Sequence, residues 1–215
     1  MLHGRLTKPL AWIVGLAGFY WVLLGSLTLD ALDKELPRRG EICPAPSEEL
    51  VPRVELRDLN AADPEIGAAL SCLPPRHLAQ ARAFGARLVV TQTLLSKILP
   101  GLFENELFEV GGVYDRETRT MYVNQDKGGP GRTALHEFGH LFDHILGDRS
   151  STSDFLSAFS VAKDGGRLGA HYASSPKEFF ADGYARYYFS DRSRRRFRDE
   201  YPDAARVFEA LDGRQ

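Results

Sequence analysis

The sequence predicts an α+β domain preceded by one apolar N-terminal segment. Three observations support this prediction. A β-branched run, Arg87–Thr93, is typical of a strand. The segments Glu109–Val113 and Arg119–Val123, with the turn Asp115–Glu117 between them, predict an antiparallel hairpin. The rest of the chain from residue 56 onward is dominated by helical patterns, as the elements below show in order.

The N-terminal segment is typical of a membrane or signal helix. Residues 10–29 carry no charge, and 20 apolar residues suffice to cross a hydrocarbon layer of roughly 30 Å. Arg5 and Lys8 precede this run, which favours a cytoplasmic N-terminus. We expect residues 1–30 to be a signal-anchor or a cleaved signal peptide. The remainder would then lie outside the cytoplasm, anchored to the membrane or, after cleavage, secreted.

A stalk and one domain follow. Residues 31–55 are rich in proline and charge, as expected of a stalk, and residues 56–215 form the predicted domain. Cys43 and Cys72 would lie where a disulfide can persist, so they form either one bridge or two separate buried thiols.

Local signals place the helices. Asp63-Pro64 is typical of an N-cap followed by proline at the first helical position, which predicts a short helix to about Cys72. Further helices are expected at about 76–84, 132–146, 152–163, 178–189 and 202–213, with glycine-rich loops at 124–131 and 164–169. The 132–146 helix has an apolar side at helical spacing and Gly147 as its C-terminal cap.

The motif His136-Glu137-Phe138-Gly139-His140 carries the chemistry. Two histidines four residues apart lie on one side of a helix, so both can bind one metal ion. Glu137 between them is placed to act as general base on a zinc-activated water. His144 continues the row, but about 12 Å along the axis separates it from His136, so we expect it outside the metal shell.

Glu178, about forty residues later, is the predicted third ligand of a zinc ion, since two histidines and a glutamate with an open fourth position are typical of catalytic zinc. Ser175-Pro176-Lys177-Glu178 is also a capping-box pattern, in which Glu178 would instead reach back to the Ser175 backbone. Asp182, one turn further, would accept a hydrogen bond from a ligand histidine or be solvated.

Two side chains in the preceding loop, His171 and Tyr172, could each donate a hydrogen bond to the oxyanion of an attacked carbonyl. Tyr184, Tyr187 and Tyr188 are expected to pack at helical spacing. The arginines between 192 and 198 could attract an anionic lipid or cell-wall polymer, but such a cluster is more often a solvated loop and helix face. The net charge of −2 and the absence of a nucleic-acid module argue against nucleic-acid binding.

The residues Val113-Tyr114 to Gly147, with Leu135-His136-Glu137-Phe138-Gly139-His140 among them, and Glu178-Phe179-Phe180-Ala181-Asp182 resemble the catalytic domain of anthrax toxin lethal factor and its bacterial relatives, which include the Pro-Pro endopeptidases. The resemblance covers about residues 85–211.

This resemblance implies a zincin-type cleft between a small twisted mixed sheet and helices. It implies His136, His140 and Glu178 as zinc ligands, Glu137 as catalytic base and Tyr172 as the oxyanion-side phenol. It also implies that Arg119–Val123 is the edge strand beside the cleft. Two departures stand out: the interval from Tyr172 to Glu178 is one residue shorter than in lethal factor, and Asp182 stands where lethal factor has glutamate.

The sequence therefore predicts an endopeptidase with one Zn²⁺ that hydrolyses a protein or peptide substrate outside the cytoplasm. Two alternatives stay open. The chain could be a catalytically inactive zinc-binding or interaction domain of the cell envelope, or a zinc hydrolase that does not act on peptides.

Overall fold

The computed structural model describes residues 63–99, 110–166, 168–169 and 171–213, all of which belong to one compact unit within Pro37–Gln215. The predicted N-terminal helix, the stalk and Cys43 lie outside these ranges. None of the helices in the described part of the chain is long and apolar enough to cross a membrane. Cys72 is half-buried, and its thiol donates to the carbonyl of Ala68 at 3.5 Å.

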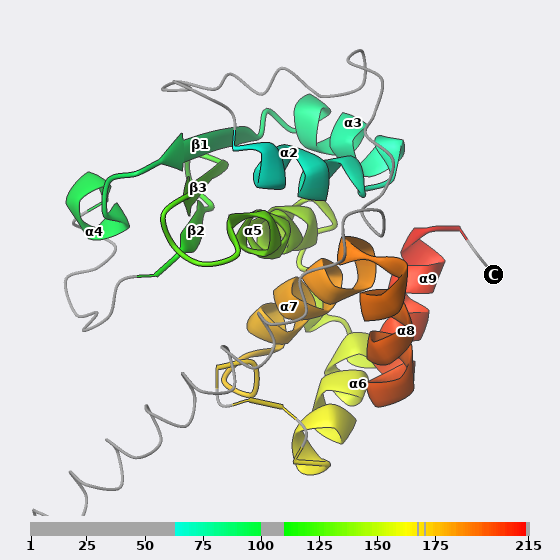
Figure 1. Ribbon diagram of the computed structural model, residues 1–215. Coiled ribbons are helices and arrows are strands. Elements are labelled where there is room, and N and C mark those ends of the chain that lie inside the picture. Colours follow the sequence, from blue (N-terminus) through cyan, green and yellow to red (C-terminus); the bar gives the residue numbers. More distant parts are fainter. Residues whose placement is uncertain (1–62, 100–109, 167, 170, 214–215) are drawn as a thin grey trace, which may run out of the picture. The chain divides into compact units, whose positions relative to one another are not determined.

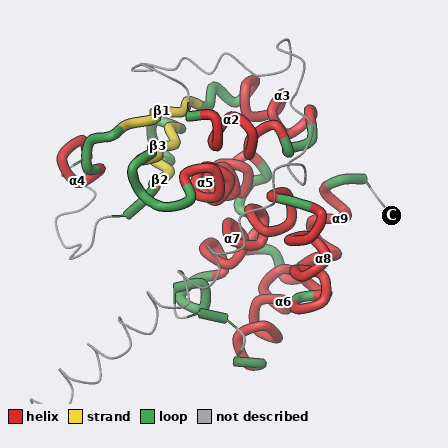
Figure 2. Tube along the Cα trace, viewed as in Figure 1, coloured by secondary structure: helices red, strands yellow, loops and turns green. Residues whose placement is uncertain are grey.

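The described residues form a mixed α+β fold with eight α-helices and a three-stranded sheet (Figures 1 and 2). The first elements are α2 (Pro64–Ser71), α3 (Pro75–Ala83), β1 (Arg87–Thr91) and the short α4 (Leu95–Ile98). The hairpin strands β2 (Gly112–Asp115) and β3 (Thr120–Asn124) follow, and then α5 (Pro130–Ile145). The C-terminal part contains α6 (Ser153–Asp164), α7 (Pro176–Phe189), α8 (Asp191–Glu200) and α9 (Pro202–Leu211).

The predicted boundaries hold for most elements. The Asp63 side chain caps α2 by accepting from the Glu65 amide at 2.8 Å, as the Asp-Pro pair indicates. Helix α5 begins two residues earlier than expected, because Gly129 adopts φ 69° and Pro130 starts the first turn. Gly147 follows α5 with φ 73°, the left-handed conformation predicted for its cap.

The sheet contradicts the prediction that Arg119–Val123 is an edge strand. The strand order is β1-β3-β2, with β1 parallel and β2 antiparallel to β3. β3 is therefore the central strand, and Met121, Val123 and Asn124 are buried in it. The hairpin was predicted correctly, but its sequence does not indicate whether β1 pairs with β2 or with β3. The two edges of this sheet are β1 and β2.

Helix α5 is central to the fold. It packs against β2 and β3 on one side and against α7 on the other, while α2 also contacts it (Figure 1). Its predicted apolar residues Leu135, Phe138, Leu141 and Phe142 are buried, and Ile145 packs partly against the core. Because α5 carries the histidine motif, the core holds that motif rigidly between sheet and helices.

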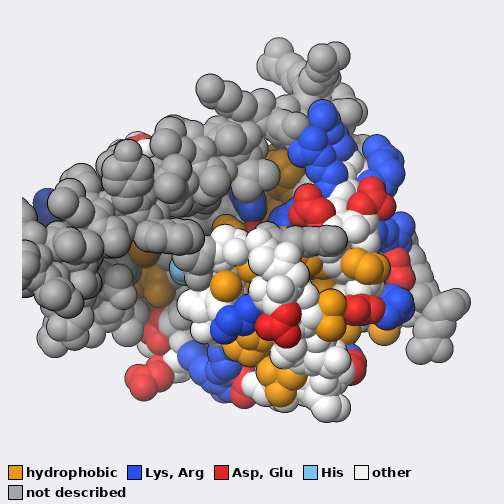
Figure 3. All heavy atoms as spheres, turned by 90° about the horizontal axis from the view of Figure 1, so that it is seen from below, with side chains coloured by type: hydrophobic (Ala, Val, Ile, Leu, Met, Phe, Trp, Pro, Cys, Tyr) orange, Lys and Arg blue, Asp and Glu red, His pale blue; other side chains and the backbone are white. Residues whose placement is uncertain are grey.

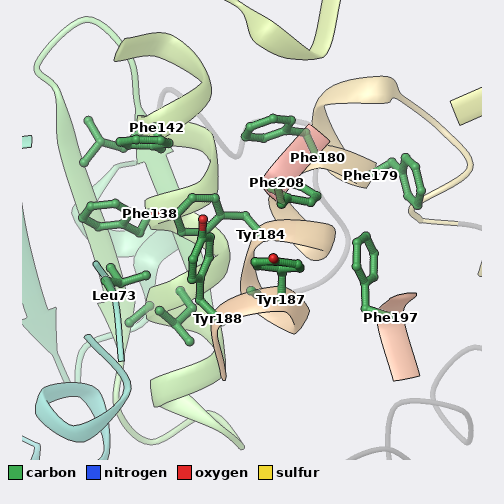
Figure 4. Close-up of a cluster of buried hydrophobic side chains, with 14 of the residues drawn as sticks. Leu73, Phe138, Phe142, Phe179, Phe180, Tyr184, Tyr187, Tyr188, Phe197 and Phe208 are labelled. Atoms are coloured by element: carbon green, nitrogen blue, oxygen red, sulfur yellow. The ribbon is translucent and has the colours of Figure 1, made fainter. Parts of the chain in front are cut away.

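An aromatic core fixes α7 to its neighbours (Figure 4). Tyr184, Tyr187 and Tyr188 are fully buried, which confirms their predicted packing role. Tyr184 stacks beside Phe138 of α5, with ring centroids 5.8 Å apart, and Tyr187 stacks beside Phe208 of α9 at 5.6 Å. Such aromatic contacts each add about 0.5–1.5 kcal/mol beyond area burial.

The arginine-rich segment forms α8, with Ser190 as its side-chain cap and Phe197 buried in the core. Among its five arginines, Arg194 pairs with Asp191 at 3.3 Å, and Arg198 pairs with Glu209 at 2.8 Å. On the face shown in Figure 3, basic and acidic side chains are interspersed. These pairs favour the solvated-surface interpretation over an anion-binding patch.

His77, which sequence reasoning did not single out, is a buried polar group in this core. Its side chain is 1% exposed, its Nδ1 lies 2.8 Å from the Tyr184 hydroxyl, and its ring lies 4.1 Å from that of Phe142. Burial lowers the pKa of His77 from 6.5 to about 4, and the charge of Asp212 offsets this only in part. The folded protein therefore holds this imidazole neutral.

This burial predicts a pH-dependent stability. Between pH 6.5 and about pH 4, His77 is protonated in the unfolded chain but neutral in the folded one, so folding loses stability as the pH falls through this window. The shift corresponds to about 3 kcal/mol at full development. Urea unfolding at pH 7 and pH 4.5 measures the change, and His77→Asn should reduce it. An equal pH dependence in His77→Asn would contradict this assignment.

Candidate metal centre

Helix α5 presents two imidazoles to one point. His136 and His140 are one helical turn apart, and their Nε2 atoms approach to 3.2 Å, with the rings edge to face. Both side chains are 18% exposed, so they face a site that solvent still reaches. This is the geometry that the spacing of the motif predicts.

Glu178, in the first turn of α7, completes the group. Its Oε2 lies 3.3 Å from His136 Nε2, and its Oε1 lies 3.5 Å from His140 Nε2. Ligand atoms of a tetrahedral zinc ion, each about 2.0–2.1 Å from the metal, stand about 3.4 Å apart. Glu178 meets the two imidazoles through different oxygens. With one ligand atom taken from each residue, the three atoms lie within 4.8 Å of one another and could hold a metal ion.

The capping-box pattern left two roles open for Glu178, and in the structure these roles belong to two different residues. The Ser175 hydroxyl accepts from the Lys177 amide at 3.1 Å, so Ser175 caps α7. The Glu178 carboxylate faces the imidazoles instead. Burial raises its pKa, but hydrogen bonds with His136, His140 and His171 outweigh burial and hold the pKa far below its usual range. The carboxylate is therefore ionised, as a metal ligand must be.

A close approach of α5 and α7 brings Glu178 to the histidines. A methyl group on Gly139 would lie 2.7 Å from Ala181 Cα and 3.0 Å from the Ala181 carbonyl oxygen, closer than real contacts allow. Gly139, inside the histidine motif, therefore permits the helix spacing on which the donor group depends. Sequence reasoning gave this glycine no role.

Glu137 lies between the metal group and the sheet. Its side chain is 5% exposed, and its carboxylate lies against Gly112 of β2, where an added methyl would come within 2.7 Å of Oε1. Burial raises the pKa of Glu137, although His136 and His140 act in the opposite direction. A raised pKa suits a carboxylate that must accept a proton and release it again near neutral pH.

Asp182 has neither of its two predicted roles. It is 3% exposed, so it is not solvated, and its Oδ1 accepts from Arg132 Nη2 at 2.9 Å. Arg186 lies 3.9 Å from its other oxygen. The charged partners of Asp182 are therefore arginines, and Arg132 stands one turn before His136 on the same side of α5.

The two loop candidates differ in where they point. His171 Nε2 lies 3.0 Å from Glu178 Oε2, and the His171 side chain is 68% exposed. Tyr172 is more buried, and burial, followed by the interaction with Asp182, raises its pKa well above the usual range. Its ring centroid is 6.5 Å from that of His136.

His144 is outside the donor group, as the distance argument predicts. Its Nδ1 lies 2.8 Å from the Tyr114 hydroxyl, and its ring packs edge-on against Phe84. Arg132, Gly112 and Gly139 are the site residues that sequence reasoning missed. Only Arg132 had a usable signal, namely its position four residues before His136.

Comparison with protein families finds no matching family, and comparison with curated proteins finds no match either. Among solved structures, the chain is similar to the Pro-Pro endopeptidase PPEP-2 from Paenibacillus alvei, with a TM-score of 0.60 and 21% sequence identity. The similarity covers 73% of this chain and 95% of that one. At this identity the likeness concerns the fold.

Proposed function

We propose that this chain is a zinc-dependent endopeptidase whose ligands are His136, His140 and Glu178. The observation that carries the proposal is that His136 Nε2 and His140 Nε2 lie 3.2 Å apart and 3.3 and 3.5 Å, respectively, from the two oxygens of Glu178, with the buried carboxylate of Glu137 beside them. The fold shared with a Pro-Pro endopeptidase supports hydrolysis of peptide bonds as the reaction. The chemistry of two imidazoles and one carboxylate supports zinc as the metal.

Each residue has a defined task in this reaction. Zinc, when bound, supplies a Lewis acid that activates water and polarises the peptide carbonyl. Glu137 takes one proton from the attacking water while the water oxygen bonds to the carbonyl carbon. It returns that proton to the amide nitrogen as the carbon–nitrogen bond breaks, and the second water proton then passes from the new carboxyl group to the released amine. The products are a carboxylate and a protonated amine.

The peptide would bind along β2. This strand is an edge of the sheet, and its Gly112 touches Glu137, whereas β3 is paired on both sides. An extended peptide beside β2 would gain main-chain hydrogen bonds and bring its carbonyl to the metal group. The predicted N-terminal segment would hold this domain to the outer side of a membrane, or direct its secretion.

The test combines metal content with cleavage of a peptide library by the purified full chain. We expect about one zinc ion per chain, cleavage that EDTA abolishes, and recovery on adding Zn²⁺. A chain that binds no zinc would overturn the proposal. Zinc binding without hydrolysis would indicate the inactive binding domain, and hydrolysis of esters but not peptides would indicate another class of hydrolase.

A further inference from the structure

In the loop before α7, His171 and Tyr172 are both candidates for donating a hydrogen bond to the substrate. In the proposed reaction, which this inference rests on, the carbonyl oxygen of the substrate gains negative charge as water attacks. A hydrogen-bond donor near the metal stabilises that charge. His171 and Tyr172 are adjacent in sequence, and their ring centroids are 5.3 Å apart. Their contacts assign them different roles.

Tyr172 is tied to the protein interior. Its phenol is largely buried and interacts with Asp182, which is itself buried and held by Arg132 at 2.9 Å. A phenol in that environment must leave it before it can serve the substrate. The arrangement therefore suits an anchor that fixes the loop to α5 and α7.

His171 faces the metal group. Its Nε2 lies 3.0 Å from Glu178 Oε2, the oxygen that also lies 3.3 Å from His136 Nε2. The donor atoms that lie within 4.8 Å of one another among the described residues come from His136, His140 and Glu178. His171 thus stands at the rim of that group. With 68% of its side chain exposed, the imidazole can meet a substrate without displacing core atoms.

We infer that His171 is the catalytic residue that hydrogen-bonds the developing oxyanion, and that Tyr172 is a positioning residue acting through Asp182. As the water oxygen bonds to the carbonyl carbon, the π-electron pair of the carbonyl moves onto its oxygen. The Nε2–H of His171 donates to that oxygen and keeps its proton. Its contact with Glu178 in the absence of substrate holds the imidazole in reach.

The test compares His171→Ala and Tyr172→Phe in the full-length zinc-loaded protein, with His144→Ala as a matched histidine control outside the donor group. We expect His171→Ala to lower kcat about 100-fold, with little change in KM, because one oxyanion donor is worth about 10²–10³ in kcat. His171→Gln, which keeps an N–H donor, should recover part of the loss. Tyr172→Phe should cost less than about tenfold.

Metal binding supplies a readout independent of turnover. Zinc affinity, and the visible absorption of the cobalt-substituted protein, should be the same in wild type and His171→Ala. Loss of zinc affinity by tenfold or more would identify His171 as a ligand and overturn the inference. Full activity in His171→Ala, or a 100-fold loss in Tyr172→Phe, would overturn it as well. Absence of peptide cleavage by the zinc-loaded wild type would instead contradict the proposed function.

Discussion

Replacing Glu137 by glutamine is expected to lower kcat about 10²- to 10⁴-fold while the zinc content stays at the wild-type level. The amide has nearly the shape of the carboxylate, so the contact with Gly112 and the positions of His136 and His140 are preserved. It cannot accept the proton of the attacking water, however. The loss should therefore appear in kcat rather than in metal binding, and steady-state kinetics with zinc analysis of the same sample measure both.

A matched control is available on the same helix. His144→Ala changes a motif-proximal residue of α5 whose contacts are Tyr114 and Phe84, so it should retain both zinc and turnover. Zinc-loaded Glu137→Gln that cleaves peptides at the wild-type rate would remove Glu137 from the mechanism. Loss of zinc in this variant would mean that the carboxylate supports the metal site instead.

The donor group was predictable from sequence because its geometry is local. Two histidines at i and i+4 share one helix face whatever the rest of the fold does, and the apolar stripe of α5 showed which face was buried. Glu178 required more, since a capping box and a ligand have the same sequence pattern here. The structure satisfies both demands with different residues: Ser175 caps α7, and Glu178 faces the histidines.

The remaining features depend on contacts between distant segments. The order β1-β3-β2 arises from a parallel pairing of β1 with β3, and no periodicity within either strand encodes its neighbour. For Asp182 the sequence predicts either a ligand histidine or solvent as partner, whereas its actual partner Arg132 lies 50 residues earlier and is joined to it by no local pattern. The close approach of Gly139 to Ala181 likewise exists only when two helices meet.

Two helices, α4 and α8, were not predicted from the sequence, and the reason differs from that for the long-range contacts. α4 has four residues, fewer than any hydrophobic period needs to become visible. α8 has ten, but its five arginines conceal the single buried Phe197 that fixes it to the core. In both segments the tertiary contact, rather than the local pattern, decides the conformation.

Separate substitutions of Glu178 and Ser175 should distinguish a loss of zinc affinity from a loss of helix capping. Glu178→Gln is expected to reduce zinc affinity by tenfold or more, because it removes a charged donor that lies 3.3 and 3.5 Å from the two imidazole nitrogens. Ser175→Ala removes the acceptor for the Lys177 amide and should cost about 1 kcal/mol of stability with zinc affinity retained.

Zinc titration against a competing chelator and urea unfolding, both applied to both variants, distinguish the two roles. Zinc affinity should depend on residue 178 alone among this pair, since the Ser175 hydroxyl serves the backbone of α7 and the Glu178 carboxylate faces the histidines. If Glu178→Gln instead keeps wild-type zinc affinity and loses only about 1 kcal/mol of stability, Glu178 is a capping residue. The metal would then have only the two histidines of α5 from the proposed donor set, and the catalytic proposal would fall with it.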